Sequence, residues 1–454
     1  MNRRNFLRNT LVSAMAGAYG TSLLATGPLL ASSIGSSFNK VTAGYKALVC
    51  VFLYGGNDGF NMVVPRDPLG YGNYQTSRQN LAIAQNELLP ITPRSGGDYG
   101  FHPSMPDMQS LFAAGDLAIQ ANIGTLVEPV TRAQIQAKNA NLPPQLFSHN
   151  SQQALWETAY ASESASLGWG GLLADRLGYL NSSLVPMNVS ITGNNLFQVG
   201  ENHAPYAMNA SGPDEMIGVR HSVEWEQYRA QAFDRIRDMQ SNHILEQAHK
   251  DLTRSTQSTA QLLGSSLETA PVLTTPFPEE NNLADQLAMV AKMISVSEEL
   301  GFERQIFIVG MGGFDTHDRQ NQDQPNLLGG LSQALAAFNQ ATQELGVANQ
   351  VTSFTHSDFG RTLTSNGDGT DHGWGSHHLM MGGAVNGGDI YGTMPELSIG
   401  GPDDADDGRM IPTTSVEQYS ATLARWFGLP ENELNTVFPN LGNFSSADLG
   451  FMQS

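Results

Sequence analysis

The sequence predicts an α/β protein with a mainly parallel sheet. Short apolar runs rich in β-branched residues alternate with amphipathic segments, which is the pattern of repeated strand–helix units. The first run, residues 46–54, is apolar at almost every position, as in strands that helices cover on both faces. Most of them lead into polar turns, where α/β proteins place their ligand sites.

Five apolar runs are expected to form strands. The first, residues 46–54 (KALVCVFLY), ends in the glycine-rich turn 55–59 and is expected to be a buried central strand. The others are residues 117–123, 185–192, 305–309 and 350–354, and HHLMMGGAV (377–385) is a further candidate.

Helical patterns lie between these runs. Residues 282–300 and 327–345 carry apolar side chains at the i, i+3, i+4 and i+7 spacing of an amphipathic helix. Residues 415–427 are expected to end at the glycine and proline that follow them. Shorter helices are predicted over residues 106–114, 151–161 and 170–180.

Residues 195–276 do not follow this alternation of strands and amphipathic helices. They contain a long polar helix, expected over 223–267, and a serine- and threonine-rich tail. A polar helix of this length bridges through solvent, caps a site or makes an oligomer contact. We therefore expect one α/β domain over residues 45–454, in which 195–276 are a helical insertion or cap.

The amino-terminal leader predicts export. Met1–Arg8 (MNRRNFLR) carries a twin arginine followed by a weakly apolar stretch, the pattern of a Tat signal. Residues 1–37 are expected to be signal peptide and linker, so the Tat translocase is a partner during export. Pro28 and several glycines interrupt the stretch, so no stable membrane anchor is expected after cleavage. The expected location is the periplasm or the exterior.

Charge and cysteine content exclude some classes of protein. The formal net charge is −20, whereas nucleic acids and anionic membranes bind basic patches. We therefore expect neither as a partner. The single cysteine, Cys50, allows no internal disulfide, and its apolar neighbours indicate a small core residue.

Two polar clusters stand at expected strand or helix ends in the first third of the chain. In GGNDGFN (55–61), Asp58 projects from a turn at the carboxyl end of the first strand. In LFSHNSQ (146–152), Ser148 or Ser151 either caps the following helix or lies at its amino terminus as a nucleophile. His149 is a base, a metal ligand or a core histidine.

Two further clusters follow later strands. In GMGGFDTHD (310–318), Asp315 and His317 share one face of an extended segment and suit two ligands of one metal, or else Asp315 caps a helix. Residues 352–383 hold four histidines and three aspartates, including Asp358 and His372. Arg361 in this stretch either holds an anionic substrate or forms a structural salt bridge.

The chain resembles the DUF1501 family of Tat-exported proteins. The leader and the motifs GGNDG, FSHNSQ, GGFDTH, SDFGRT and DHGWGSHH carry this resemblance in order. It implies an alkaline phosphatase/sulfatase-like fold, a three-layer α/β/α sandwich with a mixed sheet. It also implies one or two divalent metal ions (zinc, manganese or calcium) and a serine nucleophile near Ser148 or Ser151. The implied metal ligands are Asp58, Asp315, His317, Asp358 and His372.

The chain departs from that pattern at three places. Phe359 stands where the resemblance expects a histidine beside Asp358, so either His356, His149 or His377 substitutes or only one metal binds. The spacing of Asp315 and His317 is shorter than in phosphatases. No cysteine is available for the formylglycine of a sulfatase, because Cys50 lies in the first strand.

Two functions remain open from the sequence. The first is an exported metal-dependent hydrolase that acts on phosphate or sulfate esters, small or polymeric. The alternative is a non-catalytic exported binding or assembly module that keeps the fold. The substrate, the metal and the oligomeric state are not predicted.

Overall fold

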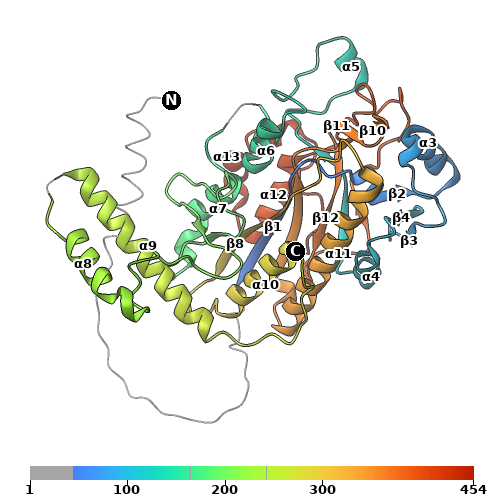
Figure 1. Ribbon diagram of the computed structural model, residues 1–454. Coiled ribbons are helices and arrows are strands. Elements are labelled where there is room, and N and C mark those ends of the chain that lie inside the picture. The colour runs from blue at the N-terminus through green and yellow to red at the C-terminus, as the bar shows by residue number, and fades with distance from the viewer. Residues whose placement is uncertain (1–43, 163–164, 242, 454) are drawn as a thin grey trace.

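In the computed structural model, which describes residues 44–162, 165–241 and 243–453, a nine-stranded sheet forms the middle layer (Figure 1). Its strands are β1 (Lys46–Leu53), β5 (Leu117–Gly124), β6 (Asn188–Ser190), β7 (Tyr206–Ala207), β8 (Arg304–Met311), β9 (Val351–Ser357), β12 (Ser376–Met381), β13 (Ile390–Tyr391) and β14 (Thr414–Ser415). The order is β13-β5-β12-β9-β1-β8-β6-β7, and β14 also pairs with β5. The leader expected over residues 1–37 lies outside the described residues.

The sheet is mixed but mainly parallel. β1 lies between β8 and β9 and is parallel to both, whereas β12 is antiparallel to β5 and β9. Alternate residues of β1 enter two different hydrophobic cores, with Val49 on one face and Cys50 on the other. A strand buried on both faces needs apolar residues throughout, which explains the continuous apolar run in the sequence.

Helices cover both faces of the sheet and complete the three layers. The first core joins the sheet to α4 (Pro106–Ala114), α10 (Asn282–Ser295) and α11 (Gln320–Glu344). The second joins it to α6 (His149–Thr158), α7 (Trp169–Leu177), α12 (Val416–Phe427) and α13 (Leu434–Val437). The predicted α/β/α sandwich is confirmed.

Smaller elements surround the carboxyl edge of the sheet. All of them except the 11-residue helix α3 are three to five residues long, which leaves little periodicity in the sequence. They are α2 (Gly59–Met62), β2 (Val63–Pro65), α3 (Pro68–Arg78), β3 (Leu89–Ile91), β4 (Tyr99–Phe101), α5 (Arg132–Gln136), β10 (Arg361–Ser365) and β11 (Thr370–His372). None of these elements is predicted from the sequence.

Two helix predictions need correction. The expected helix over 327–345 begins earlier, at Gln320, because α11 continues through Pro325 near its start. The expected single helix over 223–267 is two helices, α8 (Gln227–Arg237) and α9 (Ile244–Glu268). His243 caps α9 by accepting from the backbone N–H of Leu245, so a polar side chain begins a new helix where continuous helix was expected.

The hairpin of α8 and α9 projects from the body (Figure 1). Only the carboxyl-terminal half of α9 is anchored, where Leu263 and Leu267 enter the first hydrophobic core. Ser266 donates a hydrogen bond to Glu299 at 2.7 Å, and Glu299 precedes the amino end of β8. The base of the hairpin is therefore attached near the amino edge of the sheet. Across the described residues, no helix combines the length and apolarity that crossing a bilayer requires.

Buried Glu417 in α12 makes the stability of the fold depend on pH. Burial raises its pKa from 4.5 to about 7, although Asn440 donates two hydrogen bonds to it. The folded state thus binds the proton more tightly than the unfolded state, and stability falls as pH rises from about 4.5 to about 7. This loss is worth about 3 kcal/mol.

We expect Glu417→Gln to remove the part of the pH dependence that Glu417 contributes, because the amide resembles the protonated acid and keeps one acceptor oxygen. Glu157, whose pKa burial also raises to about 7, keeps its own part. Urea unfolding at several pH values between 5 and 8 measures how the free energy of unfolding changes with pH in the wild type and the variant. An unchanged slope in the variant would contradict the assignment.

Candidate metal centre

The parallel strands of the sheet bring the candidate residues to one edge. β1, β8 and β9 run parallel, so the turns after their carboxyl ends meet. Asp315 follows β8, Asp358 follows β9, and Gly55 follows β1. His149, the first residue of α6, reaches the same place from the neighbouring layer.

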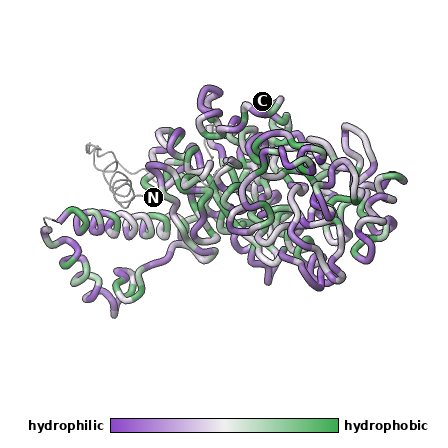
Figure 2. The backbone as a smooth tube through the Cα atoms, turned by 90° about the horizontal axis from the view of Figure 1, so that it is seen from above, coloured by the Kyte–Doolittle hydropathy of each residue, from purple (hydrophilic) through white to green (hydrophobic). Residues whose placement is uncertain are grey.

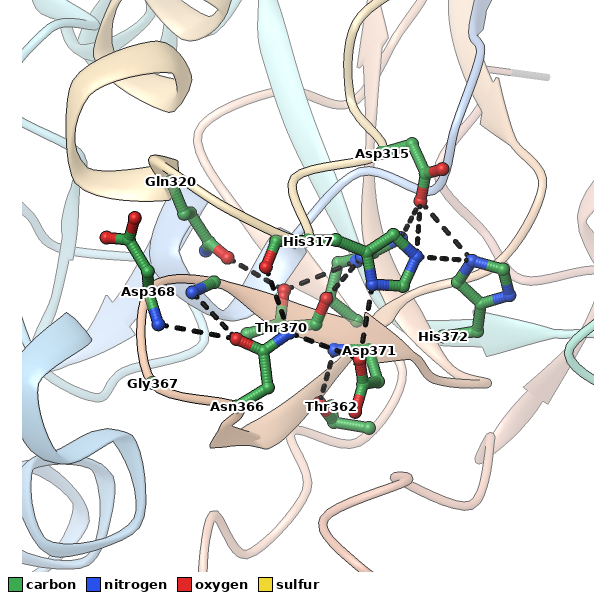
Figure 3. A network of polar contacts seen from close by, with 12 residues as sticks. Asp315, His317, Gln320, Thr362, Asn366, Gly367, Asp368, Thr370, Asp371 and His372 are labelled. Carbon is green, nitrogen blue, oxygen red and sulfur yellow. Dashed lines mark hydrogen bonds and ion pairs between the residues drawn. The ribbon is translucent and has the colours of Figure 1, made fainter.

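The carboxylate of Asp315 is the centre of the group. Its Oδ1 lies 3.1 Å from Nε2 of His317 and 3.3 Å from Nε2 of His372, as Figure 3 shows. Its Oδ2 lies 3.4 Å from Nε2 of His149. Three imidazoles therefore turn the same ring nitrogen toward one carboxylate.

His149, Asp315 and His372 form a set that could hold a metal ion, since one ligand atom from each lies within 4.8 Å of the others. His317 adjoins this set, with its Nε2 2.9 Å from Nε2 of His372. The structure thus brings together three of the predicted site residues, with a fourth beside them.

The other ring nitrogen of each imidazole is held by an acceptor. Nδ1 of His372 lies 2.7 Å from the carbonyl oxygen of Phe147, which can only accept, so this nitrogen carries the proton. Nδ1 of His149 donates to Asp358 at 2.5 Å, and Nδ1 of His317 to Asp371 at 3.1 Å.

In the tautomers that carry the proton on Nδ1, the Nε2 lone pairs are directed at the centre. Burial lowers the pKa of His372, which favours its neutral form. Two lone pairs that face each other at 2.9 Å, as in His317 and His372, repel unless a proton or a cation lies between them. Histidines that ligate metals usually donate their second nitrogen to a carboxylate or carbonyl in this way.

Arg361 fixes the charge and orientation of Asp315. Its buried guanidinium donates to Asp315 Oδ1 at 2.6 Å and to the carbonyl oxygen of Gly55 at 3.1 Å. It also binds both oxygens of Thr370. Burial raises the pKa of Asp315, but Arg361 and the adjacent histidines outweigh this and lower it. Arg361 is expected from the sequence either to hold an anionic substrate or to form a salt bridge, and in the structure it forms a salt bridge with Asp315.

Asp358 lies behind His149 rather than among the ligand atoms that converge. It accepts from His149, from Gln153 at 2.9 Å and from the backbone N–H of Gly55 at 3.1 Å. The carboxylate therefore orients His149. Its prediction as a direct metal ligand stays a prediction.

Asp58 is not brought into the group. It is buried and forms an ion pair with Arg78, and Gln320 donates to it at 2.5 Å. Its prediction as a ligand also stays untested, but the structure gives its carboxylate other partners.

Phe359 contacts two of the histidines directly. Its ring centroid lies 4.9 Å from that of His149 and 4.6 Å from that of His372, so it packs against both imidazoles. Of the three histidines expected to substitute at this position, His149 reaches the group. His356 and His377 are fully buried elsewhere, against Trp156 and Phe60 respectively.

Among the described residues, no hydrogen bond joins the side chain of either candidate nucleophile to the group. Ser148 precedes α6 at the cap position, without a side-chain cap bond. Ser151 donates to Gln145 at 2.8 Å. The predicted serine nucleophile therefore stays a prediction.

Sequence reasoning missed several supporting residues. Gln153 is four residues after His149 in α6, so helical spacing alone would have placed both on one face. Asp371 stands in the histidine-rich stretch but was not chosen as a site residue. The carbonyl of Phe147 and the partner of Asp58, Arg78, carry no signal in the sequence.

Comparisons with known proteins give a family and distant structural similarities. The model of the family described as "Protein of unknown function (DUF1501)" matches residues 45–437. No curated protein matches the chain.

Solved structures with a similar fold include sulfatases. The PsFucS1 sulfatase from Pseudoalteromonas sp. is 9% identical with a TM-score of 0.34, over 86% of this chain and 68% of that one. The putative sulfatase yidJ from Bacteroides fragilis is 11% identical with a TM-score of 0.34, over 89% and 80%. Ps i-CgsB is 11% identical with a TM-score of 0.35, over 87% and 76%. All three similarities are distant.

Proposed function

We propose that this chain, which belongs to the DUF1501 family, is a metal-dependent hydrolase of phosphate or sulfate esters. One observation carries the proposal: the Nε2 atoms of three histidines converge on the Asp315 carboxylate while each Nδ1 is held by an acceptor. A purely structural ion-pair cluster does not require all three rings to turn the same nitrogen toward one carboxylate.

The donor set favours zinc or manganese among the ions considered. Imidazole nitrogen with one carboxylate is typical of zinc and is accepted by manganese, whereas calcium prefers oxygen ligands alone. His149, Asp315 and His372 would hold the ion, with His317 beside them. Such an ion polarises an ester oxygen and lowers the pKa of a coordinated nucleophile.

The surrounding residues suit an anionic substrate. His149 is the first residue of a ten-residue helix, and the free backbone N–H groups at a helix amino terminus favour negative charge. Arg361 keeps Asp315 ionised and fixed, and Phe359 limits rotation of the His149 and His372 rings. A phosphate or sulfate group beside the ion would meet this helix end.

Export belongs to the same proposal. The twin-arginine leader supports passage through the Tat translocase, which carries folded proteins, and action in the periplasm or outside the cell. A hydrolase located there would meet small or polymeric esters.

The test is hydrolysis of aryl phosphate and aryl sulfate esters by the mature chain. We expect turnover of at least one of the two, loss of turnover after chelation, and recovery when zinc or manganese is restored. Turnover that resists complete metal removal would overturn the proposal. A metal-loaded protein that binds sulfated polymers without cleaving them would support the alternative of a binding module.

A further inference from the structure

Exposed apolar side chains are concentrated on the projecting hairpin. Among the described residues sixteen large apolar side chains are exposed, and ten of these lie between Met216 and Leu262. They are Met216, Ile217, Trp225, Tyr228, Ile236, Met239, Ile244, Leu245, Leu252 and Leu262. Single exposed apolar residues are ordinary, but a cluster of this size marks a surface for interaction.

The apolar residues follow a helical stripe. Along and beside α8, Trp225, Tyr228, Ile236 and Met239 are spaced by multiples of three and four residues, with Ala232 between them. This spacing places them on one face of the helix. On α9, Leu245 and Leu252 repeat at seven residues, the interval of helices that pack side by side.

The hairpin is ordered by its own polar contacts rather than by these apolar residues. Arg254 of α9 pairs with Asp238 at the end of α8 at 2.9 Å, and Arg237 donates to Gln257. Figure 2 shows both helices extending away from the body, with apolar positions along them. The stripe is thus presented in a fixed shape, which lowers the entropy cost of docking.

Charge identifies the occupant. Residues 216–262 carry six basic and six acidic side chains, a formal charge of zero, whereas the whole chain carries −20. Two copies of so acidic a chain repel each other through most of their surfaces. The repulsion is weakest between surfaces whose basic and acidic charges balance. An anionic membrane would instead favour a strongly basic face.

The available area is in the range that a stable dimer needs. Trp225 is 67% exposed and Tyr228 83%, so these two aromatic side chains alone offer roughly 300 Å². Standard interfaces bury about 800 Å² on each partner. The other eight exposed apolar residues between Met216 and Leu262 can supply the rest of this area.

We propose that the hairpin docks against the same hairpin of a second copy, so that α8 and α9 of both chains form a four-helix contact with two-fold symmetry. A second copy offers the matching stripe in the matching shape, as a self-complementary interface requires. This dimer is independent of the hydrolase proposal, because the hairpin is anchored near the amino edge of the sheet and the metal centre lies at the carboxyl edge.

The test is the molar mass of the mature chain by light scattering and sedimentation over a dilution series. We expect a dimer for the wild type. The Tyr228→Asp/Ile236→Asp variant should be monomeric, with a dissociation constant raised at least ~100-fold. Leu184→Asp, at an 84% exposed residue outside the hairpin, is the control and should stay dimeric.

Circular dichroism checks that each variant is folded, and Leu252→Asp provides a second variant on α9. A monomeric wild type at every concentration would overturn the proposal, as would a dimer that both hairpin variants retain. A monomer that binds anionic phosphatidylglycerol vesicles through the hairpin would also overturn it.

Discussion

Asp315→Asn is expected to lower metal affinity by more than ~100-fold and to remove turnover. Loss of a residue that only supports a ligand costs about 10- to 100-fold. The amide has nearly the same size but no negative charge. The Asp315 carboxylate contacts all three site histidines. Its replacement also leaves Arg361 without its charged partner.

Two comparison variants make this result specific. Asp358→Asn removes the carboxylate that orients His149 and should weaken metal binding by about 10- to 100-fold. Asp368→Asn changes an exposed aspartate in the turn between β10 and β11 and should change neither metal binding nor turnover. Metal titration and ester hydrolysis of all three variants measure the series. Full metal binding by folded Asp315→Asn would contradict the proposed centre.

Arg78→Met is expected to destabilise the fold by about 3–5 kcal/mol, because it leaves the buried Asp58 carboxylate without its cation. Both side chains of this pair are almost completely buried. Arg78 also donates to Asn61 at 3.0 Å and to the carbonyl of Thr362 at 2.9 Å, so it joins α3 to β10. Urea unfolding measures the loss.

The exposed pair of Arg319, which precedes α11 at the N-cap position, and Asp323 in its first turn provides the control. Arg319→Met should cost less than about 0.5 kcal/mol, as for other solvated helix pairs. Equal losses in the two variants would show that the Arg78 pair is not the buried structural contact described above.

Asp58→Asn separates two roles for Asp58. If the carboxylate only neutralises Arg78, the variant loses stability but keeps its metal. If Asp58 is a ligand, as the family resemblance implies, metal content falls as well. Measuring both quantities on the same preparation distinguishes the two roles.

The parallel core of the fold was predictable because its signal is local. A strand such as β1, buried on both faces, must be apolar at nearly every position, and the glycine-rich turn after it marks its end. The break between α8 and α9 was missed because charged residues continue on both sides of it. Helical composition alone does not show where a cap such as His243 begins a new helix.

The candidate site was predictable in its residue types but not in its contacts. Strand-end clusters indicated Asp315, His317 and His372, since parallel strands bring such turns together. Whether Asp58 meets them depends on Arg78, which is twenty residues away in a segment without a motif. Likewise, a backbone carbonyl such as that of Phe147 has no side-chain identity to detect.

Metal content of the wild-type protein tests the central claim most directly. The exported chain would be purified without chelator or affinity metal and analysed by plasma mass spectrometry. The geometry around Asp315 predicts at least one equivalent of a divalent transition metal such as zinc or manganese, lost in Asp315→Asn. A folded protein that hydrolyses its ester while free of metal would contradict it.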